Sequence, residues 1–269
     1  MSVTYPLGFR AGGIQAGLRT TPGLDLALIV NDGPADVVAG VFTTNRVCAA
    51  PVQWSRHATA DHKARAVIGN AAVANACTGS DGFADCDITF SRVDSDACMS
   101  TNDTVVAMAS GASGISLTGD ELTDALTELC AILARQLVAD AEGSHHDVKV
   151  TVTGAISTEA AVAVAREVTR SNLVKTAIAG NDPICGRILE AIGCVPANIA
   201  PFEPDQVDVS INDIQICKAG GIGEDRNLVD MRPREVHIDI ELHAGDAEAA
   251  VWTNDLTHQY VEENSAYTS

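Results

Sequence analysis

The clearest periodicity in the chain is an apolar stripe with helical spacing. Thr118-Gly-Asp-Glu121 has the form of a capping box, in which the threonine hydroxyl accepts from the amide three residues on and the glutamate reaches back. Apolar residues then recur on one side of the expected helix, at Leu122, Leu126, Leu129, Ile132, Leu133 and Leu137. The pattern predicts one amphipathic helix over residues 118–138.

Other stretches have the alternation or the β-branched content of strands. Two short apolar runs, residues 26–30 and 37–42, lie on either side of an Asn-Asp-Gly-Pro turn, which predicts an early β-hairpin. Further strands are predicted over residues 65–69, 148–153, 207–211, 214–217 and 236–242. Two more helices are predicted, one over residues 157–168 that Ser157 or Thr158 caps and one over residues 184–192.

The order of these elements indicates the fold class. Strands and helices follow one another without a regular βαβα alternation, which favours a layered α+β fold over a doubly wound parallel sheet. The period changes between the helix that ends near residue 138 and the strand that begins at residue 148, with His145 between them. We therefore predict two parts, residues 1–145 and residues 146–269.

Charge and composition exclude several classes of protein. The 269 residues include 17 Lys plus Arg against 36 Asp plus Glu, which gives a formal net charge of −19. Because nucleic-acid binding draws much of its affinity from basic residues that neutralise phosphates, a general nucleic-acid binder is excluded. No stretch approaches the roughly 18 consecutive apolar residues of a membrane helix, and the start, MSVTYPLGFR, is unlike a signal peptide. We expect a cytoplasmic protein with no membrane partner.

Motifs for metal or cofactor chemistry are lacking. The eight cysteines are scattered, with no CxxC pair and no paired histidines at metal spacing, so we expect reduced, buried thiols. No GxGxxG or Walker loop is present, so no nucleotide cofactor is implied. The glycines after Lys218 form either a loop cluster, which we favour, or an anion-binding nest.

Two polar segments leave alternatives open. His145 and His146 adjoin Asp147, which suits a general base, but adjacent side chains rarely face one point, and we favour two solvated histidines at a helix end. Residues 100–104 read Ser-Thr-Asn-Asp-Thr, and they form either a turn that starts a helix or part of a site. No catalytic triad is readable from spacing.

Several blocks of the chain carry a resemblance to a known family. They read FRAGGIQAGLR, DLALIVNDGPADVVAGVFTTNRVCAAPVQWSR, RAVIGNAAVANACTG, VDSDACMSTNDTV, ADAEG, SNLVKTAIAGNDPICGR and WTNDLTHQYVEENSAYTS. Taken in order, these blocks resemble the ornithine acetyltransferase family, the bifunctional glutamate N-acetyltransferases of arginine biosynthesis. The resemblance implies layered sheets and helices similar to those of N-terminal-nucleophile enzymes, with a smaller C-terminal α/β subdomain.

The resemblance also implies an activity and three site residues. Members are acyltransferases that need no metal or nucleotide: the precursor cuts itself before a threonine, and acetyl passes from N-acetylornithine to that threonine and then to glutamate. The cut chains are expected to form homo-oligomers. The matching substrate-contacting positions are Glu142 in ADAEG, Asn264 near the C-terminus and Ser269.

The family's middle segment has no counterpart in these blocks. In the family it carries the oxyanion donors, a substrate-binding lysine and the cleavage site with its nucleophile. Here Cys86 passes directly into Asp87, whose following text the family places well after that site. We expect an internal deletion with its junction close to these two residues, and no catalytic residue is nominated. Thr59 lies in the only Ala-Thr pair, but its surroundings do not resemble the cleavage motif.

Three hypotheses for function follow. The first is an acetyltransferase of arginine biosynthesis, and the second is a catalytically inactive remnant that lacks the autocleavage threonine. A third, an acidic chaperone-like interaction module, rests only on the net charge of −19. The deletion is further expected to leave unpaired strand edges and uncovered apolar faces.

Overall fold

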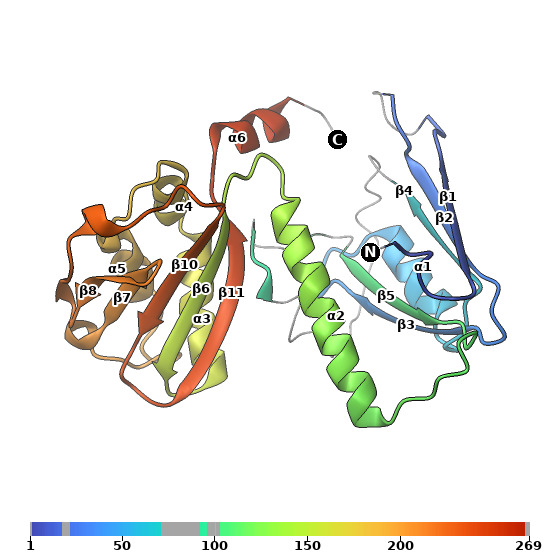
Figure 1. Cartoon of the computed structure of the whole chain (residues 1–269), viewed down its shortest axis with the longest axis horizontal. Coiled ribbons are helices and arrows are strands. Elements are labelled where there is room, and N and C mark those ends of the chain that lie inside the picture. Colours follow the sequence, from blue (N-terminus) through green and yellow to red (C-terminus); the bar gives the residue numbers. More distant parts are fainter. Residues whose placement is uncertain (1, 18–21, 71–91, 96–99, 101–102, 267–269) are drawn as a thin grey trace. The chain divides into compact units, whose positions relative to one another are not determined.

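The described residues form two compact units, and Figure 1 labels most of their helices and strands. The computed structural model describes residues 2–17, 22–70, 92–95, 100 and 103–266. Of these, residues 92–95 and 126–266 belong to the second unit and the others to the first. Both units are built from more than one stretch of sequence, so the predicted division between residues 145 and 146 stays a prediction.

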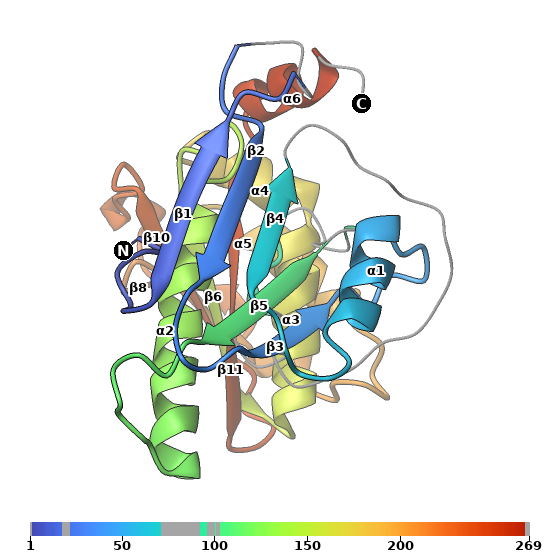
Figure 2. The ribbon, with the colours of Figure 1, turned by 90° about the vertical axis from the view of Figure 1, so that its right-hand side faces the viewer.

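The first unit contains two small antiparallel sheets. In one of them β2 (Leu26–Asn31) lies between β1 (Phe9–Ile14) and β4 (Ala66–Asn70), as Figure 2 shows. In the other, β3 (Val37–Phe42) pairs with β5 (Thr104–Ala109). Both runs around the Asn-Asp-Gly-Pro turn are strands, as predicted, but the predicted hairpin is wrong, because β2 and β3 belong to different sheets.

The buried side chain of Asn31 explains this change of sheet. Its Oδ1 accepts from the amide of Gly33 at 3.0 Å, and its Nδ2 donates to the carbonyl of Ala35 at 3.1 Å. The same Nδ2 lies 3.4 Å from the carbonyl of Ala109 in β5. These bonds form an Asx-type turn that directs the chain to a partner distant in sequence.

The first unit also contains α1 (Ala50–Ala58) and the start of α2 (Gly119–Ala139). The capping box of α2 is present: Glu121 N donates to Thr118 Oγ1 at 3.3 Å, and Thr118 N donates to Glu121 Oε2 at 2.8 Å. The predicted helix is confirmed. The alternative that residues 100–104 form a turn that starts a helix is wrong, because Thr104 begins β5. Residues 101 and 102 lie outside the described residues.

The second unit is a six-stranded sheet covered by helices (Figure 1). In spatial order the strands are β11 (Ala247–Asn254), β6 (Asp147–Ala155), β10 (Glu235–Glu241), β7 (Asp208–Ile211), β8 (Ile214–Lys218) and β9 (Gly221–Ile222). Strands β6 and β10 run parallel, and the other neighbours run antiparallel. The helices are α3 (Thr158–Arg170), α4 (Asn172–Ala179), α5 (Cys185–Gly193) and α6 (His258–Ser265), with short 3₁₀ turns η2 (Pro204–Gln206) and η3 (Arg226–Leu228). The mixture of sheets and helices confirms the α+β class.

Alternation along the central strands builds the core of this unit. Val148, Val150 and Val152 on β6 are buried, as are Val236, Ile238 and Ile240 on β10, while the residues between them are partly or fully exposed. Helix α3 packs against β6 and β11. Each fully buried Val or Ile side chain contributes about 1.5–3 kcal/mol relative to exposure, so this face holds the second unit together.

The glycine cluster after Lys218 makes a hairpin turn between β8 and β9. Ala219 and Gly220 both have positive φ, 47° and 68°, as a two-residue type I′ turn requires. The loop alternative is therefore the one that the structure favours over a nest.

The described cysteines are free thiols. Cys48 and Cys217 are buried, Cys130 and Cys185 are partly buried, and Cys194 is exposed. The expectation of buried thiols is therefore wrong for Cys194, which lies at the end of α5. The remaining three cysteines lie outside the described residues.

Candidate functional site

Two of the three predicted substrate-contacting residues lie side by side, although they are far apart in the sequence. Asn264 Nδ2 donates to Glu142 Oε2 at 2.9 Å and to the carbonyl of Tyr260 at 3.0 Å. Both Glu142 and Asn264 are exposed. Ser269 lies outside the described residues. The contact joins the loop after α2 to helix α6 within the second unit.

Gly143 allows this loop to approach α6. Its φ is 61°, and a Cβ at this position would lie 2.3 Å from Tyr260 N, so only glycine fits. Thr257 Oγ1 donates to the carbonyl of Gly143 at 2.6 Å and accepts from Tyr260 N at 3.0 Å. Thr257 is thus both the N-cap of α6 and its link to the loop that carries Glu142.

Asp255 holds the other side of the same loop. Its buried Oδ1 accepts from the amides of His145 and His146 at 2.9 and 3.0 Å, and its Oδ2 lies 2.9 Å from His146 Nδ1. His146 Nε2 lies 3.0 Å from the carbonyl of Met231. His145 is exposed, but the expectation of two solvated histidines is wrong for His146, which is 5% exposed. Because both its ring nitrogens face acceptors inside the fold, His146 orients the loop and has no nitrogen left to act as a general base.

Asn254 completes the attachment at the end of α2. Its Nδ2 donates to the carbonyl of Val138 at 2.8 Å and to Ser144 Oγ at 3.0 Å. Asn254, Asp255 and Thr257 therefore all bond to residues 138–146, and we name these three residues the C-terminal clamp. The clamp positions Glu142 next to Asn264.

A pocket of about 310 Å³ opens beside the clamp. Its lining consists of Ser95, Thr169, Arg170, Asn172, Lys175, Asp255, Leu256 and Tyr260. Arg170 Nε donates to Asp94 Oδ2 at 2.8 Å, and the buried Lys175 donates from Nζ to Thr253 Oγ1 at 3.0 Å. The lining thus combines two cations, one of them paired with Asp94, with the carboxylate of Asp255.

Sequence reasoning missed these pocket residues. Lys175 lies within the apolar run of α4, where Val174, Ala177 and Ile178 are buried. A lysine among apolar residues on the buried side of a helix is a signal of a polar contact inside the fold, and it could have pointed to this pocket. The three clamp residues belong to the block WTNDLTHQYVEENSAYTS, but nothing in the sequence indicated their hydrogen bonds to residues 138–146.

Neither a metal cluster nor a membrane span is found in the part of the chain that the structure describes. No three or more His, Cys, Asp or Glu side chains among the described residues could hold a metal ion together. Of the helices formed by those residues, none has both the length and the apolar character to cross a membrane.

Comparisons with protein families, with known proteins and with solved structures all lead to the same family. The sequence profile of the ArgJ family matches residues 10–89 and 84–269. Proteins named arginine biosynthesis bifunctional protein ArgJ are similar to the chain: that of Bifidobacterium longum is 39% identical over 391 aligned positions, and that of Streptomyces coelicolor is 38% identical over 386, each alignment covering 100% of both proteins. The crystal structure of arginine biosynthesis bifunctional protein argJ from Bacillus halodurans matches with a TM-score of 0.61 and 34% identity, covering 67% of this chain and 88% of that one.

These alignments contain positions that have no residue here. The Bifidobacterium longum alignment has 391 positions for a chain of 269 residues, so at least 122 positions lie opposite gaps in this chain. The two profile matches overlap at residues 84–89, the region that contains Cys86 and Asp87. The family prediction made from the sequence blocks is confirmed: the chain belongs to the ArgJ family.

Proposed function

We propose that this chain derives from a glutamate N-acetyltransferase of the ornithine acetyltransferase type, and that it has kept substrate-holding residues but lacks the catalytic segment. Its named relatives are bifunctional proteins of arginine biosynthesis. In the reaction that the resemblance implies, a threonine hydroxyl attacks the acetyl carbonyl of N-acetylornithine and ornithine leaves with its amine protonated. The amine of glutamate then takes the acetyl group from the threonine ester.

Substrate binding by these residues is supported by the hydrogen bond between Glu142 and Asn264, which is 2.9 Å long. A carboxylate held in place by an amide binds the ammonium group of an amino acid through charge-assisted hydrogen bonds. Among the described residues no donor contacts Asn264 Oδ1, so this oxygen can accept from a substrate N–H. The resemblance assigns Ser269, which lies outside the described residues, to the same substrate-contacting set. We further propose that the protein is cytoplasmic and forms homo-oligomers.

The proposal that the nucleophile is missing is supported by the alignment positions that lie opposite gaps in this chain and by the overlap of the two profile matches. In the family that the chain resembles, the threonine, the oxyanion donors and a substrate-binding lysine all lie in the segment that has no counterpart here. Losing a covalent nucleophile together with its oxyanion donors costs many powers of ten in rate. We therefore expect a catalytically inactive remnant that binds ornithine without transferring acetyl groups.

Calorimetric titration with ornithine tests the substrate part. Removing one charge from a charged hydrogen bond costs about 1.5–3 kcal/mol, so Glu142→Gln is expected to weaken binding by about 10- to 150-fold. Glu203→Gln changes an exposed carboxylate elsewhere in the second unit and serves as the matched control. No binding to the unmodified chain, or an equal loss in both variants, contradicts the role of Glu142.

An assay for acetyl transfer from N-acetylornithine to glutamate tests the missing nucleophile. The purified chain is expected to remain a single uncut species by intact mass and to show no transfer above background. Turnover by the uncut chain, or cleavage into two chains, contradicts this part of the proposal and favours the intact acetyltransferase.

A further inference from the structure

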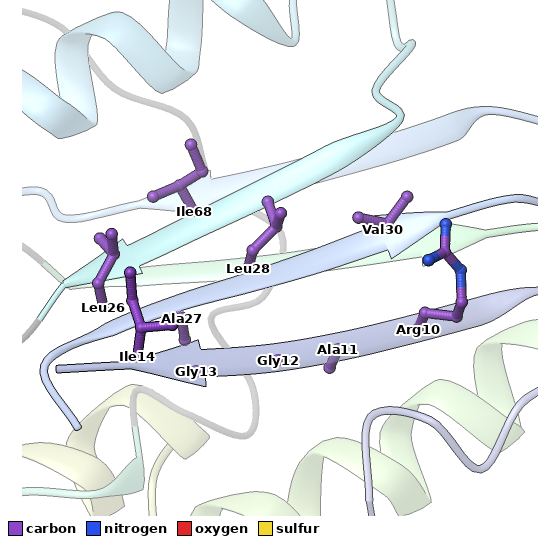
Figure 3. Close-up of a pocket in the computed structure, with 10 residues that line it drawn as sticks. All are labelled: Arg10, Ala11, Gly12, Gly13, Ile14, Leu26, Ala27, Leu28, Val30 and Ile68. Carbon is purple, nitrogen blue, oxygen red and sulfur yellow. The ribbon is translucent and has the colours of Figure 1, made fainter. Parts of the chain in front are cut away.

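One face of the three-stranded sheet in the first unit is apolar. Leu28 on β2 lies opposite Gly12 on β1 and Ile68 on β4, and Leu26 lies opposite Ile14. Because directly paired residues point to the same side of a sheet, their side chains form one surface. Figure 3 shows Leu26, Leu28 and Ile68 on the same side of the ribbon.

This surface is open rather than packed. A groove of about 470 Å³ follows β1 and β2, and the side chains that line it include Ile14, which is 59% exposed, Leu28, 42%, and Ile68, 71%. A Cβ on Gly12 would meet nothing within 4 Å, so the floor of the groove has room for an inserted side chain. Large contiguous apolar patches on a soluble protein mark interaction sites.

The groove lies on strands that precede residues 84–89 in the sequence, where the two profile matches overlap. Strand β4 is at the edge of its sheet, with β2 as its only strand neighbour among the described residues. It ends at Asn70, and the overlap of the profile matches begins at residue 84. At about 3.3–3.6 Å per residue, such a connection spans up to about 50 Å, so a segment inserted there can fold back over β4.

The size of the gap fits a covering layer. At least 122 aligned positions have no residue in this chain, a length within the usual range of a folded domain. A second copy of this chain lacks the same positions, so it brings no covering segment; pairing of the two bare faces in a homodimer is the competing outcome.

We propose that the groove lined by Ile14, Leu26, Leu28 and Ile68 docks a separate polypeptide that carries the segment absent here. Apolar side chains of that polypeptide fill the groove, and its backbone can pair with the edge of β4. The chain is then the scaffold half of a two-chain assembly. This inference rests on the proposed function only in taking the segment as missing.

Coexpression tests the docking. The chain is produced together with a tagged segment of the Bifidobacterium longum relative that aligns opposite the gap, and the pair is purified through the tag. A 1:1 complex by light scattering is expected. Ile68→Asp and Ile14→Asp are expected to weaken association at least tenfold, because each puts a charge in the apolar groove. Since both positions are exposed in the free chain, both variants should keep its circular dichroism spectrum.

Ile222→Asp is the matched control, because Ile222 is 96% exposed on β9 in the second unit. It is expected to leave the complex intact. Absence of a complex, or a complex that neither groove variant weakens, overturns the proposal. A homodimer that Ile68→Asp abolishes, without capture by the segment, also overturns it and assigns the groove to a second copy.

Ornithine titration of the same samples separates this proposal from the proposed function. A complex without ornithine binding supports the docking and contradicts the substrate role of Glu142. Ornithine binding without a complex supports the substrate role and overturns the docking.

Discussion

The two units bury their apolar strand residues to different extents: the strands of the second unit alternate between buried and more exposed residues, whereas β2 in the first is a continuous apolar run with little burial. In the second unit, Val150 and Ile238 lie between the sheet and its helices and are almost completely buried. In the first, Ile14 and Ile68 remain exposed, and the buried cluster among its described residues is small, formed by Cys48, Ala49 and Val52. Apolar runs and alternation both predict strands, but burial of their side chains needs a second layer packed against the sheet.

The largest difference in stability between the units is expected when an aspartate replaces an apolar strand residue in each of them. Ile238→Asp puts an unpaired carboxylate in the core and should destabilise the second unit by about 5 kcal/mol or more, enough to unfold it. Ile68→Asp, on the exposed face of β4, should cost no more than about 0.5 kcal/mol. Urea unfolding followed by circular dichroism measures both. Similar losses would remove the contrast between the units.

The second effect concerns the buried polar contacts of the second unit. Asp255→Ala leaves the amides of His145 and His146 and the ring of His146 without their acceptor. Breaking a buried charged contact by removing one partner costs about 3–5 kcal/mol, and we expect a loss in this range. Hydrogen exchange at the two amides should rise together with it.

A surface ion pair provides the control for that loss. Asp230 and Arg232 lie 2.7 Å apart and are exposed, and hydrogen bonds from Arg232 lower the pKa of Asp230 to about 2. Asp230→Ala is expected to leave urea unfolding at neutral pH unchanged, because exposed pairs are screened by solvent. An equal loss in the two variants would mean that burial does not set the strength of these contacts.

Local patterns predicted α2, α3, α5 and most strands of the second unit, but they missed α1, α4, α6 and β11. Contacts between distant segments were beyond them. The cap of α3 is an example of the first kind: Ser157 Oγ accepts from Ala160 N at 3.1 Å, and both partners are close in the sequence. The wrong hairpin is an example of the second, because Asn31 directs the chain toward β5. The burial of His146 likewise depends on Asp255, more than a hundred residues further on. The contact between Glu142 and Asn264 came from family resemblance alone, since no periodicity links the two positions.

A smaller effect is expected from the clamp at α6. Thr257→Ala removes the N-cap and the bond to the carbonyl of Gly143, and the loss of an N-cap costs about 1 kcal/mol. Because the Glu142 loop is then held less firmly, ornithine binding should weaken as well. Thr257→Ser keeps the hydroxyl and is the control. Unchanged ornithine affinity in Thr257→Ala would separate the clamp from the substrate site.

The smallest effect compares the first turns of two helices, one beginning in each unit. Hydrogen bonds from the backbone and side chain of Thr118 lower the pKa of Glu121 at the start of α2, and hydrogen bonds from its own amide and from Ser157 lower the pKa of Glu159 at the start of α3. A carboxyl whose pKa is lowered on folding stabilises the fold fully above its unfolded value, about 4.3, and loses that contribution as the pH falls through the folded value.

Both first turns should therefore fray in acid over similar pH ranges, despite the difference in burial between the units. Carboxyl titration by NMR, with amide exchange at Glu121 and Glu159, measures this. Glu121→Gln should remove the pH dependence at α2 and leave that at α3. If only α3 responds, even the local capping contacts of the first unit depend on a covering layer. If both respond, the two units differ in tertiary packing alone.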